Sequence, residues 1–125
     1  MQTCLIIDEA PVIRKIASRI LLQFGLAVEC VATPAEAQIW IGENGFPDIA
    51  IVAANASEPS GVDFVREYRR RAGQAPVVIL ALLAEANLGL MTRLRRAGAN
   101  GYVFKPFDRR SLGEQLAPYI ADQAA

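Results

Sequence analysis

The feature that most constrains the fold is a fivefold alternation between short apolar runs and segments with helical spacing. The apolar runs predict strands at residues 3–7, 27–31, 49–54, 77–81 and 101–104. Between and after them, apolar residues recur every three or four positions, which predicts helices at residues 11–24, 34–43, 62–71, 85–97 and from 109 onwards. Thr33 and Glu36 form a predicted capping box for the second helix, and Pro118 should end or kink the last one.

Strands without polar alternation are typical of a parallel sheet that helices cover on both faces. Right-handed crossovers then predict a doubly wound α/β sandwich with a five-stranded parallel sheet, in which a functional site lies at the carboxyl ends of the strands. The 125 residues fit one domain over residues 1–125, long enough to bury roughly two-thirds of the surface of the unfolded chain.

The composition excludes several classes of protein. With 53% hydrophobic residues the chain is not intrinsically disordered, and its longest apolar run, residues 76–84, is too short to span a bilayer. The N-terminus lacks the pattern of a secretion signal, so we expect a cytoplasmic protein in which Cys4 and Cys30 are reduced, buried thiols. The absence of histidine excludes histidine-based catalysis and histidine metal sites.

Charge is balanced overall but uneven along the chain. Residues 1–63 carry three basic and eight acidic side chains, whereas residues 64–125 carry ten and five. The basic residues of the second half are mostly arginines on two predicted neighbouring helices. They are Arg66, Arg69, Arg70, Arg71, Arg93, Arg95 and Arg96. Cations near helix C-termini are stabilised by the helix dipole, which is a sufficient structural reason for them; the alternative is an anion-binding patch.

Several side chains should meet where the predicted strands end. Asp8 and Glu9 follow the first strand, Ala53 and Ala81 end the third and fourth, and Lys105 follows the fifth. Adjacent carboxylates beside a lysine suit a divalent ion and a phosphoryl group. Because a solvated acid pair bridged to a lysine would look the same, the spacing leaves both interpretations open.

The chain resembles the receiver domain of two-component response regulators, of the single-domain chemotaxis type. The resemblance covers nearly the whole chain. It rests on residues 4–15 with the acidic pair Asp8 and Glu9, on Gly61, on residues 97–102, and on residues 105–107. It implies the flavodoxin-like receiver fold with strand order 2-1-3-4-5.

The resemblance also assigns roles to individual residues. Asp8 and Glu9 would hold Mg²⁺, and the backbone carbonyl of Asn55 would complete its coordination. Lys105 would contact the phosphoryl oxygens, and Tyr102 matches the aromatic residue that moves inward on activation.

The chain departs from the family pattern at the reacting position. Ala53 stands where the family has the aspartate that accepts the phosphoryl group, so the resemblance implies that no acyl phosphate forms. Ala81 is matched to the threonine or serine whose hydroxyl binds that group, and Ser57 stands where the loop normally has proline. With a carboxylate missing, Mg²⁺ at Asp8 and Glu9 should bind weakly at most, and no other metal or cofactor is expected.

These departures predict a pseudo-receiver that cannot be phosphorylated and is not an enzyme. Lys105, without its usual partner, should pair with Asp8 or Glu9. The protein should act through protein–protein contacts, with a histidine kinase, a regulator or a motility component as partner, and as a monomer or weak dimer. No DNA binding and no membrane insertion are expected. The family's usual output surface would place the contacts at Leu90, Arg93, Tyr102, Phe104 and Arg109.

Two other functions remain open. Some alphaproteobacterial single-domain receivers that this chain resembles bind cyclic di-GMP through arginine-rich segments, which makes this nucleotide a candidate ligand of the arginine clusters. A receiver with an unusual acceptor, such as Ser57, is the second alternative, although no group is expected to activate that hydroxyl.

Two apolar features also allow two interpretations each. Leu82 and Leu83 form either an apolar plug or docking patch beside the site, or core contacts under the fourth helix. Trp40 is either part of the core or an exposed interaction anchor.

Overall fold

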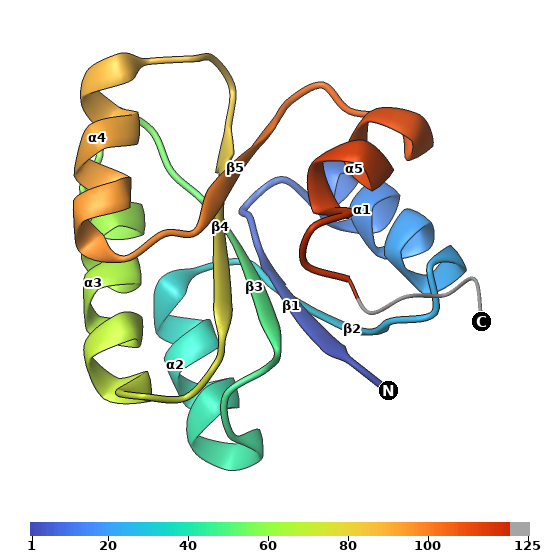
Figure 1. Ribbon diagram of the computed structural model, residues 1–125, viewed down its shortest axis with the longest axis horizontal. Coiled ribbons are helices and arrows are strands. Elements are labelled where there is room, and N and C mark those ends of the chain that lie inside the picture. Colours follow the sequence, from blue (N-terminus) through green and yellow to red (C-terminus); the bar gives the residue numbers. More distant parts are fainter. Residues whose placement is uncertain (121–125) are drawn as a thin grey trace.

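The computed structural model describes residues 1–120, and in this part of the chain five strands alternate with five helices (Figure 1). The strands are β1 (Thr3–Ile7), β2 (Ala27–Val31), β3 (Ile49–Ala53), β4 (Val78–Leu83) and β5 (Gly101–Phe104). The helices are α1 (Pro11–Gln23), α2 (Pro34–Asn44), α3 (Ser60–Ala72), α4 (Leu88–Ala97) and α5 (Arg109–Leu116). None of the helices in these 120 residues is long and apolar enough to cross a bilayer.

All strand pairs are parallel, and the sheet order is β2-β1-β3-β4-β5. Helices α1 and α5 cover one face, and α2, α3 and α4 cover the other (Figure 1). Successive residues of β3 serve the two cores in turn: Ile49 and Ile51 face α1 and α5, while Ala50 and Val52 face the other three helices. Both faces are dry, which is why the strands are continuous apolar runs. The predicted fold class and strand order are confirmed.

Strand β4 is longer than predicted and ends at Leu83 rather than at Ala81. Leu82 and Leu83 are its last two residues and are 1% and 0% exposed. Leu83 belongs to the same apolar cluster as Leu90 and Leu94 of α4. The docking-patch interpretation of these leucines is therefore wrong, and they are core residues.

Helix starts differ from the prediction because capping residues set them. Helix α4 begins at Leu88, three residues later than predicted, since the side chain of Asn87 accepts a hydrogen bond from the backbone N–H of Leu90 at 2.9 Å. Helix α3 begins earlier, at Ser60, and lies directly against the end of β3. A Cβ atom on Gly61 would lie 2.6 Å from the carbonyl oxygen of Ala53, so only glycine fits there.

The remaining sequence expectations are met in part. Thr33 caps α2 by accepting from the backbone N–H of Glu36 at 3.1 Å, but between these two described residues the reciprocal bond of the predicted capping box is absent. Helix α5 ends at Leu116, before Pro118. Cys4 is buried and Cys30 half-buried, both are free thiols, and burial raises the pKa of each. Trp40 is half-buried and packs against the core.

Candidate functional site

The carboxyl ends of β1, β3 and β5 surround an open cleft of about 650 Å³. Asp8, Glu9, Ala53, Asn55 and Lys105 all line it, together with small residues that begin α2. The structure therefore brings together the strand-end residues that the sequence singled out, with the exception of Ala81.

An ion pair closes one side of this cleft. Nζ of Lys105 lies 2.7 Å from Oδ2 of Asp8, while Oδ1 of Asp8 accepts a hydrogen bond from the backbone N–H of Ala10 at 2.8 Å. The side chain of Asp8 is 4% exposed and that of Lys105 is 26% exposed. Oδ1 of Asp8 thus has a hydrogen bond, while Oδ2 has the ion pair with Lys105 but no hydrogen bond from any described residue. A buried carboxylate without such a cation is strongly destabilising. Glu9, the other predicted partner of Lys105, is exposed.

Sequence reasoning missed Arg14, which binds the backbone of the acidic pair. Its Nη1 donates to the carbonyl oxygens of Asp8 at 2.7 Å and Glu9 at 3.1 Å. The only signal in the sequence was a cation one and a half helical turns beyond the acids, a spacing too common to single it out.

Ala53 is half-buried at the floor of the cleft and presents a methyl group. The loop that follows it is hydrogen-bonded within itself. Oδ1 of Asn55 accepts from the backbone N–H of Ser57 at 3.1 Å and from its hydroxyl at 3.0 Å. The carboxylate of Glu58 accepts from the backbone N–H of Ser60 at 3.0 Å. No side chain in this loop is placed to activate the Ser57 hydroxyl.

This set of donors does not fit the Mg²⁺ that the receiver resemblance implies. Magnesium needs near-octahedral oxygen coordination, usually with one or two carboxylates. Here both oxygens of Asp8 are engaged and position 53 has no oxygen beyond its backbone. Among the described residues, no group of three or more acidic, cysteine or histidine side chains could hold a metal ion.

The position assigned to the switch hydroxyl needs correction. Ala81 pairs with Val52 and Tyr102 in the middle of the sheet, is 0% exposed, and does not line the cleft. Leu83 is the strand-end residue instead, because its carbonyl oxygen accepts the backbone N–H of Lys105 at 2.8 Å. The error came from ending the strand two residues early. The side chain at the strand end is still apolar, so a hydroxyl is absent at both positions.

Tyr102 is half-buried and bonded to α4. Its hydroxyl donates to the carbonyl oxygen of Met91 at 2.7 Å, and the guanidinium of Arg95 lies 5.5 Å from the centre of its ring. A hydrogen bond to the first turn of α4 and a cation–π contact from its last turn therefore hold β5 to this helix.

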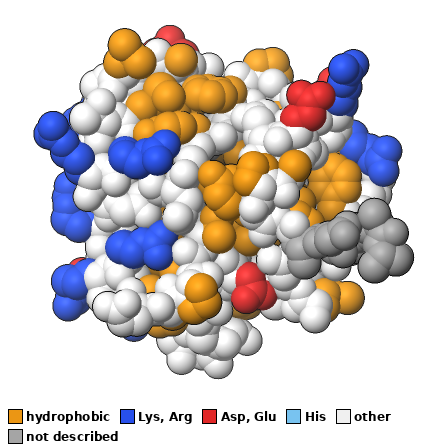
Figure 2. Space-filling model, viewed as in Figure 1, with side chains coloured by type: hydrophobic (Ala, Val, Ile, Leu, Met, Phe, Trp, Pro, Cys, Tyr) orange, Lys and Arg blue, Asp and Glu red, His pale blue; other side chains and the backbone are white. Residues whose placement is uncertain are grey.

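The predicted partner face is formed by α4, β5 and α5, with one exception among its residues. Arg93 and Arg109 are exposed and Phe104 is half-buried, but Leu90 is 3% exposed and belongs to the core. Leu90 points inward because it lies with Leu94 and Ala97, at helical spacing, on the buried side of α4, while Leu88 is 77% exposed. Figure 2 shows hydrophobic side chains across the middle of this face and Lys and Arg side chains along the side where α3 and α4 lie.

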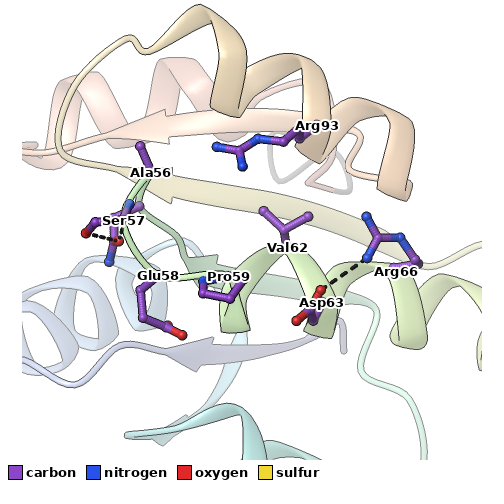
Figure 3. Close-up of a pocket in the computed structure, with 9 residues that line it drawn as sticks. Ala56, Ser57, Glu58, Pro59, Val62, Asp63, Arg66 and Arg93 are labelled. Carbon is purple, nitrogen blue, oxygen red and sulfur yellow. Dashed lines mark hydrogen bonds and ion pairs between the residues drawn. The ribbon is translucent and has the colours of Figure 1, made fainter.

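The arginines of α3 are largely bonded within the protein. Arg66 pairs with Asp63 at 3.1 Å (Figure 3), and Arg70 pairs with Glu67. Arg71 donates to the side chain of Gln38 at 2.6 Å.

Arg69 is a structural residue that ties three segments together. Its guanidinium donates to the carbonyl oxygens of Gly98 and Val77 and to Oδ1 of Asn100, at distances of 2.7–3.1 Å. On α4, Arg93 extends toward the loop at Ala56 and Ser57 (Figure 3), and Arg96 is exposed. The seven arginines are thus spread over several contacts and do not form one patch.

Comparison with known proteins identifies this arrangement. Residues 4–117 match the family described as the response regulator receiver domain. The chain belongs to that family. A receiver domain takes part in signal transduction and is not itself an enzyme.

Two chemotaxis proteins illustrate how similar its relatives are. The receiver is 27% identical over 112 residues to the chemotaxis protein CheY of Pseudomonas aeruginosa, covering 90% of each chain. The crystal structure of Vibrio cholerae CheY4 has 28% identity and a TM-score of 0.85, with 96% of this chain and 99% of that chain covered. A protein-glutamate methylesterase of Nocardioides is 27% identical, but only 31% of its length is covered, so its enzyme activity does not transfer to this receiver.

Proposed function

We propose that this receiver is not phosphorylated at position 53 and acts in signalling by binding other proteins. The observation that carries the proposal is the floor of the cleft: Ala53 offers a methyl group where a phosphoryl acceptor needs an oxygen. The ion pair between Asp8 and Lys105 uses the charges that would otherwise stabilise a phosphoryl group. The apolar Leu83 at the end of β4 is buried and adds no hydroxyl to the cleft.

The face of α4, β5 and α5 is the proposed contact surface. It combines an exposed Leu88 and half-buried Tyr102 and Phe104 with the exposed cations Arg93 and Arg109. Aromatic and arginine side chains at a partly apolar surface are typical of binding hot spots. The partners we propose are signalling proteins: a histidine kinase, a regulator or a motility component.

The contacts of Tyr102 suggest how such a protein works without phosphate. Its hydrogen bond to Met91 and the Arg95 guanidinium over its ring hold the face in one arrangement. A ligand can shift a conformational equilibrium only if it binds the two states differently. We propose that partner binding, rather than phosphorylation, is the event that distinguishes states here.

Two experiments test the proposal. Acetyl phosphate or beryllofluoride with Mg²⁺ should leave the NMR signals of Tyr102 and its neighbours unchanged. A shift of these signals, or covalent phosphate by mass spectrometry, would reject the proposal.

Capture of partners from the native cell should weaken with Arg93→Glu and Arg109→Glu. Arg19→Glu, on the exposed surface of α1, is the matched control and should bind as the wild type does.

The cyclic di-GMP alternative is not favoured by the geometry. The arginines of α3 already have internal partners, so a nucleotide would have to displace them. Calorimetry with cyclic di-GMP should therefore show no heat of binding.

A further inference from the structure

We infer that Lys105 is the internal cation of the acidic cleft, that it excludes Mg²⁺, and that it makes the domain insensitive to this ion. The inference rests on the proposed function, because both start from Ala53. It goes further by naming a positioning residue and a measurable ion response. The observation behind it is that the donor set does not fit the metal, although the acidic pair is present.

The carboxylate of Asp8 is buried. Its side chain is 4% exposed, and the backbone N–H of Ala10 satisfies only Oδ1. Oδ2 has Nζ of Lys105 at 2.7 Å. A carboxylate this buried requires a positive charge at close range, and the ammonium supplies it.

Lys105 reaches Asp8 across the carboxyl ends of the sheet. Strands β1 and β5 are not neighbours, since β3 and β4 lie between them in the sheet. The lysine side chain must therefore extend over the ends of these two strands. Ala53, which ends β3, leaves that space open because its side chain stops at Cβ. A carboxylate at position 53 would both fill the space and compete for Nζ.

The ammonium of Lys105 and a divalent ion would compete for the same oxygen. Mg²⁺ would need Oδ2 of Asp8, so Lys105 would have to leave this oxygen. If Lys105 stayed, two positive charges would lie side by side. Two nearby side-chain oxygens already have partners in the loop: Oδ1 of Asn55 accepts from Ser57, and the carboxylate of Glu58 accepts from Ser60. Without Oδ2 of Asp8, the exposed Glu9 is the remaining carboxylate of the acidic pair, so Mg²⁺ would keep most of its coordination in water and bind weakly.

The backbone bonds of the two partners show what the ion pair holds in place. The N–H of Asp8 donates to Val31 of β2, and the N–H of Lys105 donates to Leu83 of β4. The pair thus joins opposite halves of the sheet across the cleft, without a metal.

The lysine ammonium groups allow a direct test in the unmodified protein. The chain contains two lysines, Lys105 and the exposed Lys15. In ¹⁵N-detected NMR, the Nζ signal of Lys105 should be sharp and protected from exchange, whereas that of Lys15 exchanges rapidly with water. Addition of Mg²⁺ to roughly 20 mM should leave the Lys105 signal unchanged. A Lys105 signal that exchanges like that of Lys15 would overturn the inference.

Substitution provides the second test. Lys105→Met removes the charge at similar length and should increase Mg²⁺ affinity about tenfold or more, measured by shifts of the Asp8, Glu9 and Ala53 amides. Lys105→Arg keeps the charge and should remain insensitive, as should the control Lys15→Met. Asp8→Asn combined with Lys105→Met should abolish the gained response. If Lys105→Met is unfolded, the ammonium signals of the wild type decide the question.

Failure of this inference differs from failure of the proposed function. Millimolar Mg²⁺ binding by the wild type, or a folded Lys105→Met variant that ignores Mg²⁺, would overturn the inference and leave phosphorylation-independent signalling intact. Covalent phosphate on the protein would reject the proposed function instead.

Discussion

The cleft at the strand ends and the face of α4, β5 and α5 use their charges in opposite ways. In the cleft, Asp8 and Lys105 neutralise each other at 2.7 Å and are mostly buried. On the face, Arg93 and Arg109 are exposed, and neither has an ion-pair partner among residues 1–120. A buried site whose charges are paired has few free charges with which to bind a ligand. Exposed cations beside apolar groups are free to contact one. The comparison supports the proposal that this receiver acts through its surface rather than through the cleft.

The largest expected effect separates core from surface on α4. Leu90→Ala should lower the free energy of unfolding by about 2–4 kcal/mol, because Leu90 is buried and truncation leaves a cavity. Leu88→Ala should change it by less than about 0.5 kcal/mol and weaken partner capture instead. Urea unfolding followed by the fluorescence of the single tryptophan, Trp40, measures both. Equal destabilisation by the two substitutions would show that Leu88 is a core residue and does not belong to the exposed face.

The next effect tests whether the cleft is paired as described. Lys105→Met should lower the free energy of unfolding by about 2 kcal/mol, less than for a fully buried pair because Lys105 is 26% exposed. Lys15→Met, the control, should lie within about 0.5 kcal/mol of the wild type in the same urea titration. A Lys105→Met variant as stable as the wild type would mean that the ion pair contributes nothing.

A smaller effect concerns the connection between β5 and α4. Tyr102→Phe should cost about 1 kcal/mol, since it removes the hydrogen bond to Met91 but keeps the ring under Arg95. Amide hydrogen exchange in the first turns of α4 should become faster, while exchange in α1 stays as it was. Unchanged exchange in α4 would argue against a fixed face.

The smallest effect is a pH dependence at the start of α5. The backbone N–H of Ser111, donating to the Asp108 carboxylate, holds the pKa of that carboxyl below its usual value. A carboxyl with a lowered pKa contributes stability above its unfolded pKa of about 3.9, and this contribution is lost as pH falls through the lower, folded value. Asp108→Asn should keep the cap and lose this pH dependence. The measurement is the free energy of unfolding of the wild type and of Asp108→Asn from pH 7 down to acidic pH.

Sequence reasoning succeeded where one local pattern decides the structure. The uninterrupted apolar strands predicted a sheet buried on both faces, and Thr33 and Pro118 marked helix ends correctly. It failed where the end of an element depends on contacts from elsewhere. β4 continues through Leu82 and Leu83 because β3 and β5 pair with it on both sides, so Ala81 was placed at the cleft by mistake. Leu90 was assigned to the surface from the family's usual output face, whereas it lies with Leu94 and Ala97 on the buried side of α4.

What the sequence alone determined is the type of fold and the alanine at position 53, because apolar periodicity and residue identity are local properties. Only the tertiary structure decided that Lys105 pairs with Asp8 rather than Glu9, and that Arg69 binds backbone carbonyls instead of a ligand. Those outcomes depend on which groups are buried together. Whether burying a charge stabilises or destabilises the fold depends on its neighbours in space, which lie far away along the chain.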